Sequence, residues 1–311
     1  MHLSLSNFTR VRMFTHPQST TPYGLSVGDL DDFLAGIIAR HLEWSFYRLS
    51  QTSESFVRER WGEIPSYVLH IVCDFPFPVR EGENNVVVFD HHDESGGKCS
   101  VHRLLDWLVE QGAYPCVPAL MDEISAWDVQ GPQAVPPAHR PDPDALTALL
   151  SLETAQDGTG LVELSSEEVY AILWALHTAR TLKEFVELVF STNSIGWRAK
   201  RQLETIQRFK EETLIRLVAE ADIKTSPAGI RYALLRTAPA GMTSEVFARL
   251  GVDLLIHPNE RTADAVSVVR DSSGRFGQTP ISELVEVAEE QIVFRHPGGF
   301  ILVARPPVTV K

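Results

Sequence analysis

Residues 67–74, YVLHIVCD, and residues 84–90, NNVVVFD, decide the fold of this chain. Each is a short, continuous apolar run that ends in an aspartate, Asp74 in the first and Asp90 in the second. Strands that do not alternate between apolar and polar residues are expected where helices cover both faces of a sheet. The two runs therefore predict neighbouring strands of a parallel sheet.

Helical and extended patterns alternate around these two strands. Residues 11–14 favour a strand, and residues 31–42 and 101–109 carry apolar side chains at helical spacing. The order strand, helix, strand, strand, helix is typical of an α/β domain.

The second half of the chain has a different composition. A proline-rich segment over residues 131–143 precedes mainly helical segments, and an amphipathic pattern predicts a long helix over 198–221. From about residue 223, short apolar runs alternate with predicted helices over 243–251 and 281–290. We therefore expect an N-terminal domain over 1–195, a linker helix over 196–222 and a smaller α/β domain over 223–311.

Length and charge restrict the class of protein. The chain has 311 residues, more than the roughly 250 that one core usually supports. Its 28 basic and 41 acidic residues give a net charge of −13, which argues against long duplex nucleic acid as the main partner. The sequence has no apolar run of about 20 residues, no signal-peptide pattern and only three cysteines, so we expect no membrane span and a cytoplasmic location.

Acidic and imidazole side chains gather where the elements of the N-terminal domain begin or end. In open parallel sheets, ligands bind beyond the carboxyl ends of the strands. Carboxylates crowded there repel one another unless protons or cations neutralise them, and carboxylates with imidazoles suit divalent ions such as Mn²⁺. The residues concerned are Asp29, Asp31, Asp74, Asp90, His91 and His92.

Each of these residues also has a purely structural interpretation. Asp29 and Asp32 could cap the helix that follows them, because carboxylates stabilise a helix N-terminus. A single aspartate after a strand is commonly a turn residue, and adjacent histidines in a loop are commonly exposed. The coincidence of all of them at matching ends of neighbouring elements favours a site.

Three segments resemble the motifs of the DHH phosphoesterase superfamily, which includes RecJ-type exonucleases, nanoRNases, cyclic-dinucleotide phosphodiesterases and family II inorganic pyrophosphatases. VVVFDHH (86–92) resembles the signature, GDLDDFLAG (28–36) resembles the first motif, His-x-Asp-x-Asp-Gly, and IVCDFP (71–76) resembles the second. The resemblance implies that residues 1–195 form a DHH catalytic domain and that residues 223–311 form a degenerate DHHA1-like accessory domain.

The resemblance also implies a binuclear metal site that holds two Mn²⁺ ions, with Mg²⁺ or Co²⁺ as alternatives. Asp29 would ligate the first ion, Asp31 and His91 the second, and Asp74 would bridge the two. A later aspartate normally completes the second site, and Asp128 is preferred to Asp122 for this role.

The resemblance gives Asp90 and His92 roles outside the metal ligands. His92 would lie over the scissile phosphate as a cation or proton donor. Asp90 would orient one of the two imidazoles, as metal-site histidines usually require.

Two positions depart from the first motif. Val27 stands where the family has a histidine, so either that ligand is lost or His16 replaces it after an insertion of about eleven residues (17–27). His16 is preferred as the metal ligand, because it ends an apolar, strand-like run as the family histidine does. Asp32 stands where the family usually has glycine, which adds a carboxylate near the metals.

The C-terminal domain of the family grips substrate with a loop that usually reads Gly-Gly-Gly-His. Here the order is reversed, with His296 before Gly298 and Gly299. His296 would bind a substrate phosphate, or it is a strand-end histidine beside a tight turn. Arg270 is a further candidate for binding an anion.

These observations predict a manganese-dependent phosphodiesterase that hydrolyses short oligoribonucleotides or linear dinucleotides with a water activated by two metals. A cyclic nucleotide or another small phosphoester is an alternative substrate. The altered motif positions leave a second interpretation open, a catalytically silent member that binds a nucleotide or a partner protein. Self-association into a homodimer is also left open.

Overall fold

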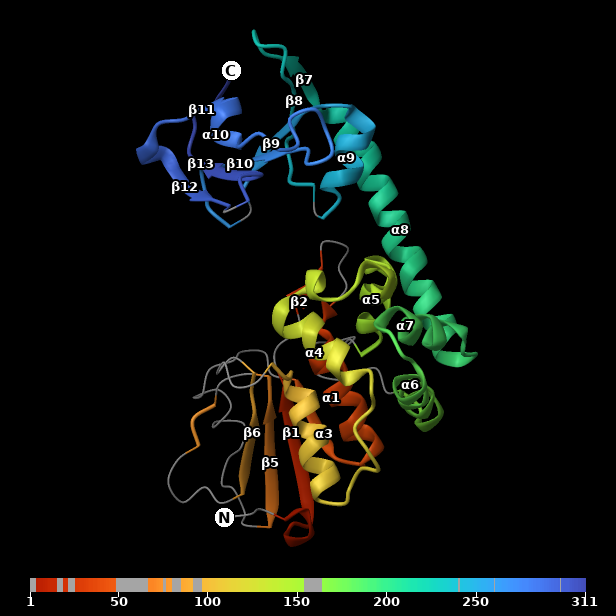
Figure 1. Ribbon diagram of the computed structural model, residues 1–311. Helices are drawn as coiled ribbons and strands as arrows, with labels where there is room; N and C mark the ends of the chain where they lie inside the picture. Colours follow the sequence, from red (N-terminus) through yellow and green to blue (C-terminus); the bar gives the residue numbers. More distant parts are fainter. Residues whose placement is uncertain are drawn as a thin grey trace. The chain divides into compact units, whose positions relative to one another are not determined.

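The computed structural model divides the chain into two compact units, residues 1–206 and 207–311 (Figure 1). The boundary between the units falls within the long helix α8 (Ser194–Glu220). The structure describes residues 4–15, 19–21, 26–48, 67–74, 77–79, 85–91, 97–153, 164–239, 241–259, 261–296 and 298–311.

A four-stranded sheet in the order β4-β1-β5-β6 forms the centre of the N-terminal unit, and every neighbouring pair is parallel. The predicted parallel sheet is confirmed, because β5 and β6 pair directly and β5 is buried along its whole length. Strand β4 at the edge was not predicted. The strands are β1 (Arg10–Thr15), β4 (Ser45–Arg48), β5 (Val68–Cys73) and β6 (Val86–Phe89).

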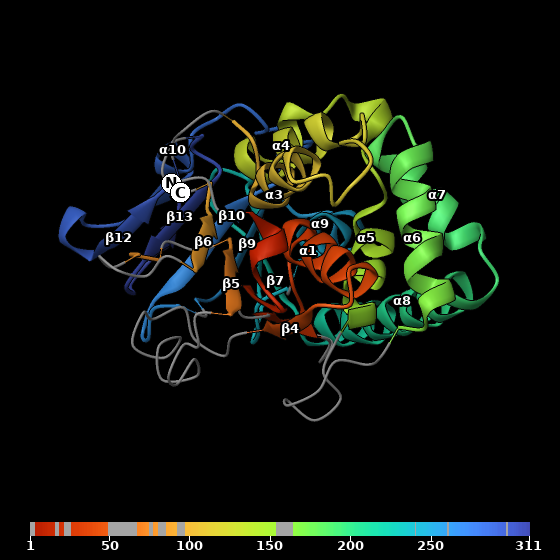
Figure 2. The same cartoon turned by 90° about the horizontal axis from the view of Figure 1, so that it is seen from below.

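Helices α1 (Leu30–His41) and α3 (Ser100–Glu110) lie against one face of this sheet (Figure 2). Their apolar sides, with Phe33, Ile37 and Leu104 fully buried, join the strands in one hydrophobic core. The rest of the unit comprises the hairpin β2 (Ser19–Thr20) and β3 (Ser26–Val27), helices α4 (Met121–Gln130), α5 (Pro143–Leu150), α6 (Ser166–Thr178) and α7 (Leu182–Ser191), and 3₁₀ turns at Leu5–Asn7, Pro132–Ala134, Pro137–His139 and Ser151–Glu153.

The C-terminal unit is built on a six-stranded sheet in the order β12-β13-β10-β9-β8-β7. Only β8 and β9 pair in parallel within it. Its elements are β7 (Asp222–Thr225), β8 (Arg231–Leu234), α9 (Thr243–Leu250), β9 (Leu254–Pro258), β10 (Val266–Arg270), α10 (Ile281–Leu284), β11 (Val285–Glu286), a 3₁₀ turn at Glu289–Gln291, β12 (Ile292–Arg295), β13 (Ile301–Ala304) and β14 (Thr309–Val310).

The prediction of one helix over residues 281–290 is wrong. The helix α10 ends at Leu284, because Val285 leaves it to pair with Val310 in a two-stranded sheet. The β-branched Val285 and Val287 favour extended backbone over helix, and burial of Val285 in this pairing outweighs the helical spacing of the segment.

Among the described residues, no helix is both long enough and apolar enough to cross a bilayer.

A partly buried ion pair fastens the start of α8 to α6. The Arg198 guanidinium donates to both carboxylate oxygens of Glu168, at 3.1 and 3.0 Å, and the Ser194 hydroxyl donates to the same carboxylate at 2.8 Å. Glu168 is only 4% exposed, so it depends on these donors for the charge it carries.

We expect Arg198→Ala to lower the free energy of unfolding of the N-terminal unit by about 2–4 kcal/mol, because it leaves a buried carboxylate without its cation. Urea unfolding followed by circular dichroism measures this. Lys183→Ala, which breaks an exposed pair with Glu187 on α7, is the control and should cost less than about 0.5 kcal/mol. Equal losses in the two variants would show that the Glu168–Arg198 pair does not stabilise the unit.

Candidate metal centre

The first turn of α1 carries three acidic residues with different surroundings. Asp29 is exposed and caps the helix, its Oδ1 accepting a hydrogen bond from the Asp32 amide at 2.8 Å. The alternative interpretation of Asp29 as a helix cap is therefore correct, and its role as a metal ligand stays a prediction. Asp31 and Asp32 are both 1% exposed, and capping of α1 does not account for that burial.

Asp31 caps a second helix. Its Oδ2 accepts from the Ser100 amide and its Oδ1 from the Val101 amide, each at 2.8 Å, so the carboxylate lies over the N-terminus of α3. Backbone amides at a helix N-terminus are favourable partners for a negative charge. Because each oxygen keeps a second lone pair, Asp31 can hold α3 and ligate a cation at the same time.

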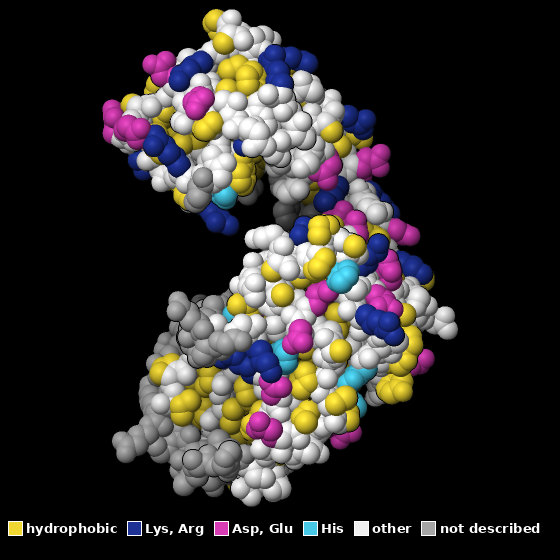
Figure 3. All heavy atoms as spheres, viewed as in Figure 1, with side chains coloured by type: hydrophobic (Ala, Val, Ile, Leu, Met, Phe, Trp, Pro, Cys, Tyr) yellow, Lys and Arg dark blue, Asp and Glu magenta, His cyan; other side chains and the backbone are white. Residues whose placement is uncertain are grey.

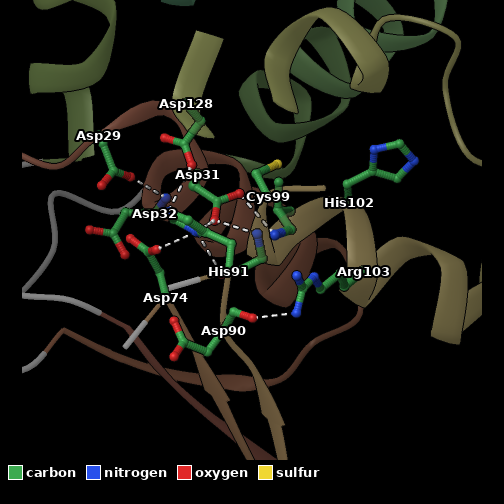
Figure 4. Close-up of polar contacts among 12 residues, drawn as sticks. Asp29, Asp31, Asp32, Asp74, Asp90, His91, Cys99, His102, Arg103 and Asp128 are labelled. Atoms are coloured by element: carbon green, nitrogen blue, oxygen red, sulfur yellow. Dashed lines mark hydrogen bonds and ion pairs between the residues drawn. The ribbon is translucent and has the colours of Figure 1, made fainter. Parts of the chain in front are cut away.

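Asp74 follows β5 in a left-handed backbone conformation with φ of 62°. Its amide donates to the Phe89 carbonyl at 2.9 Å, which continues the pairing of β5 with β6 for one residue. Residues other than glycine rarely adopt this conformation, and such strain is commonly found at functional sites. The conformation brings the buried carboxylate among the other acids of the site (Figure 4).

His91 lies in the middle of the cluster (Figure 4). Its Nδ1 is 3.1 Å from Asp74 Oδ1 and 3.2 Å from the Ser100 hydroxyl, and its Nε2 is 3.6 Å from Asp128 Oδ2. A metal-binding histidine typically has one ring nitrogen held by such partners while the other faces the metal. The contacts of Nδ1 would therefore orient Nε2 toward Asp128.

These side chains form two groups, each able to hold one ion. The ligand atoms within each group lie within 4.8 Å of one another. One group is Asp31, His91 and Asp128, and the other is Asp29, Asp32 and Asp74. Among the described residues, Asp122 belongs to neither group, and it is exposed in the first turn of α4.

The donor set fits divalent cations. Asp74 Oδ1 and Asp128 Oδ2 are buried, and among the described residues the nitrogen facing each of them belongs to the single imidazole of His91. Buried carboxylate oxygens require a compensating charge or donor. Carboxylates with one imidazole are ligands that Mn²⁺, Mg²⁺ and similar ions accept.

The pKa values of the cluster show the same need for positive charge. Burial, followed by the charge of Asp29, raises the pKa of Asp31. Burial and the charges of Asp29, Asp31 and Asp128 raise the pKa of Asp74 to about 10. Burial and the charges of Asp31 and Asp29 raise the pKa of Asp128 to about 8. Without cations, the cluster therefore retains protons at neutral pH.

For four other positions of the predicted site, the structure tests the predicted role only in part or not at all. Asp90 is 9% exposed, and its backbone carbonyl accepts a hydrogen bond from Arg103. Its predicted action on the imidazoles stays a prediction. His16 and His92 lie outside the described residues, and Val27 belongs to strand β3, where it pairs with Ser19.

Sequence reasoning missed the side chains that support α3 beneath the cluster. The Ser125 hydroxyl lies 2.9 Å from His102 Nδ1, accepts from the Cys99 amide at 3.2 Å and donates to Cys99 Sγ at 3.5 Å. These contacts hold Cys99 and His102, which flank the Ser100 and Val101 amides bound by Asp31. The only sign of this support in the sequence is a serine, Ser100, at the start of the helix.

The predicted substrate-binding residues lie together in the C-terminal unit. The Arg270 amide donates to the Phe300 carbonyl at 3.0 Å, and the Phe300 ring lies 4.0 Å from the His296 ring. Arg270 is 6% exposed and donates to the Phe276 carbonyl at 2.7 Å, while its Nε has no hydrogen bond among the described residues.

The turn between β12 and β13 explains why glycine occupies positions 298 and 299. The Gly298 amide donates to His296 Nδ1 at 3.0 Å, and a Cβ at Gly298 would meet the Phe300 ring at 3.0 Å. Gly299 has a φ of 67°. The alternative interpretation of His296 as a residue of a tight turn is therefore correct, and its binding of phosphate stays a prediction.

No family model matches the sequence, and no curated protein matches it. Among solved structures, the chain is similar to a pGpG-specific phosphodiesterase from Vibrio cholerae, with 11% identity, 97% of this chain and 93% of that chain covered, and a TM-score of 0.39. It is also similar to the DHH domain of a member of a family of ribosomal proteins, with 13% identity, 97% and 83% covered, and a TM-score of 0.34. For RecJ from Thermus thermophilus in complex with Mg²⁺, the identity is 12%, the coverage 96% and 47%, and the TM-score 0.30. Similarity at this level does not establish a common function.

We expect the stability of the metal-free protein to fall as the pH rises. Asp74 and Asp128 have higher pKa values in the folded protein than the value of about 3.9 in an unfolded chain, so the folded state binds more protons. Stability is therefore lost from about pH 4 upward, through the folded pKa values of about 8 and about 10. Divalent ions that replace the protons should raise the melting temperature more at about pH 8 than at about pH 5. Thermal shift assays with and without Mn²⁺ test this, and a metal-free melting temperature constant over the range would contradict it.

Two isosteric variants should change the stability of the metal-free protein in opposite directions at neutral pH. Asp74→Asn replaces an acid that must take up a proton on folding at neutral pH with a neutral side chain of the same shape, so its melting temperature should rise. Asp31→Asn turns an amide donor toward the amides of Ser100 or Val101 and should cost about 1–3 kcal/mol. Chemical unfolding of both variants at the same pH measures this. If the free energy of unfolding changes in the same direction in both variants, the hydrogen bonds of Asp31 do not set it apart from Asp74.

Proposed function

We propose that this protein is a divalent-metal-dependent phosphodiesterase that acts on short oligoribonucleotides or linear dinucleotides. The observation that carries the proposal is the meeting of two three-residue ligand groups beyond the ends of β5 and β6. Two divalent ions bound there would lower the pKa of a water molecule and neutralise charge on phosphoryl oxygens.

The residues of the two groups have distinct tasks. Asp31, His91 and Asp128 would hold one ion, and Asp29 and Asp74 would hold the other. Ser100 and Asp74 contact His91 Nδ1 and would fix the imidazole plane, while the α3 amides fix Asp31. His92, which directly follows this imidazole, would meet the scissile phosphate as a cation or proton donor.

The charge of the protein favours a small anionic substrate. With a net charge of −13, the chain itself repels a long polyanion. On the face that Figure 3 shows, Lys and Arg side chains are scattered among acidic and apolar ones. Local positive charge from bound ions would suffice for one or a few phosphates. We infer that a substrate phosphate is contacted by Arg270, His296, Gly298 and Gly299.

Manganese is the proposed ion because the second group combines two carboxylates with an imidazole. Purely oxygen sites suit Mg²⁺, whereas an imidazole adds affinity for transition ions. The choice of Mn²⁺ over Mg²⁺ or Co²⁺ is part of the proposal.

Hydrolysis assays on variants of the second ligand group test the proposed function. Asp122 on α4 provides the matched control for Asp128 on the same helix. We expect the wild-type protein to cleave a fluorogenic phosphodiester and linear dinucleotides when Mn²⁺ is added. His91→Ala and Asp128→Ala should each lose more than about 100-fold in turnover, because both remove a ligand of the second group. Asp122→Ala removes an exposed carboxylate from the same helix and should keep wild-type turnover.

Two outcomes of these assays would contradict the proposal. Wild-type turnover in Asp128→Ala would show that the assigned residues do not form the active site. The position of Val27 in place of the family histidine motivates the silent alternative. Stabilisation of the wild-type protein by nucleotide without any turnover would favour that alternative over an enzyme.

A further inference from the structure

We propose that two copies of this chain associate through strand β7, which pairs in antiparallel fashion with β7 of the second copy. The inference concerns assembly and does not depend on the proposed metal centre. Strand β7 forms one edge of the six-stranded sheet, and among the described residues no strand lies on its outer side. The unpaired amides and carbonyls of a sheet edge can bind a further strand.

The two edges of this sheet differ in their protection against such pairing. At the opposite edge, the register of β12 with β13 shifts between Ile292 and Phe294. A bulge of this kind is one way in which an edge strand avoids a partner. Strand β7 pairs with β8 without a shift, contains no proline and has all four residues exposed. It is therefore the edge that is open to a further strand.

The hydrogen bonds of the β7–β8 hairpin determine which backbone groups of β7 face outward. The Ser226 amide donates to the Ile230 carbonyl at 2.9 Å, and these two residues continue the register of the hairpin. Because the hydrogen-bonding direction alternates along an antiparallel strand, Lys224 also bonds toward β8. The amides and carbonyls of Ile223 and Thr225 therefore point away from the sheet, where a second strand would meet them.

Charge complementarity indicates that the second strand comes from another copy of this chain. A two-fold axis that sets Ile223 opposite Ile223 also sets Asp222 of each copy opposite Lys224 of the other. Within one chain these two charges are exposed and lie 2.9 Å apart, so pairing would join them in a group of four alternating charges. Opposite charges in cross-strand pairs stabilise a sheet.

The same association would cover apolar side chains that are exposed beside the strand. Ile223 is 43% exposed, and Ile215 on the preceding helix α8 is 57% exposed. Leu214 and Leu217 of α8 pack in one hydrophobic cluster with Ala233 of β8, opposite which Ile223 lies. A two-fold axis perpendicular to the sheet keeps α8 of both copies on the same face. Four strand residues alone make a small interface, and burial of apolar area from α8 would enlarge it.

Sedimentation velocity on the full chain tests the proposal by reversing charges. The wild-type protein should form a dimer that dissociates on dilution. Asp222→Lys and Lys224→Asp each place like charges opposite one another in both cross-strand pairs, so each should weaken the dimer at least about ten-fold. An equimolar mixture of the two variants should restore a dimer, because every cross-strand pair then joins opposite charges.

Two controls accompany the charge reversals. Arg295→Glu reverses a charge on β12, at the other edge of the same sheet, and should dimerise like the wild-type protein. Circular dichroism should show that both β7 variants are folded, because the Asp222–Lys224 pair that they lose is exposed and contributes little to stability.

Disulfide cross-linking tests the register. Opposed residues of a hydrogen-bonded antiparallel pair have Cα atoms about 5.5 Å apart, which is within the range of a disulfide. In a Cys116→Ser background, which removes the exposed native thiol, Ile223→Cys should form a covalent dimer on oxidation. Thr225→Cys should not, because position 225 lies opposite Ala221 in this register.

Three outcomes would overturn the proposal. They are a wild-type protein that is monomeric at every concentration, a dimer that neither charge reversal weakens, and a mixture of the two variants that does not associate. Each of these outcomes would leave the proposed function standing, because none of them measures metal binding or hydrolysis.

Discussion

The mutual repulsion of buried carboxylates is the constraint on which the site depends. Asp31, Asp32, Asp74 and Asp128 are largely removed from water. Burial and the charges of the neighbouring acids raise the pKa values of Asp31, Asp74 and Asp128. A fold keeps such a cluster only if something positive compensates for it, because buried charges without partners are costly. Protons do so in the metal-free protein and cations would do so in the loaded one. The cost of assembling the cluster would thus also be the source of the cation affinity that we propose.

Asp31 links the buried acidic cluster to the helices and strands around it. Its two oxygens hold the first amides of α3, and α3 packs beside α1 against the parallel sheet. Ser100, at the same helix start, contacts His91. The ends of α1, α3, β5 and β6 are therefore linked through a few polar contacts, and displacement of one would disturb the others. Ser125 and His102 extend the same support by one further layer.

The parallel sheet was predictable because the apolar runs before Asp74 and Asp90 are continuous, which is typical of strands buried on both faces. Edge strand β4 was not, because Ser45–Arg48 is short and mixes polar with aromatic residues. The helical spacing after Ile281 misled the prediction, since a pairing with the distant Val310 decides that segment. The grouping of Asp128 with Asp31 and His91 followed from the family resemblance. The burial of Asp32 could not be predicted, because it depends on residues far along the chain, such as Asp74 after β5, that come to lie beside the start of α1.

The backbone at Asp74 has a consequence for what this position can accept. A left-handed residue after a strand is tolerated by glycine and, less easily, by asparagine and aspartate, whose short polar side chains suit that region. Most other amino acids would meet a steric penalty there before any chemistry is considered. The substitutions that keep this turn are therefore Asn and Gly, and either one would remove the carboxylate while leaving the backbone in place.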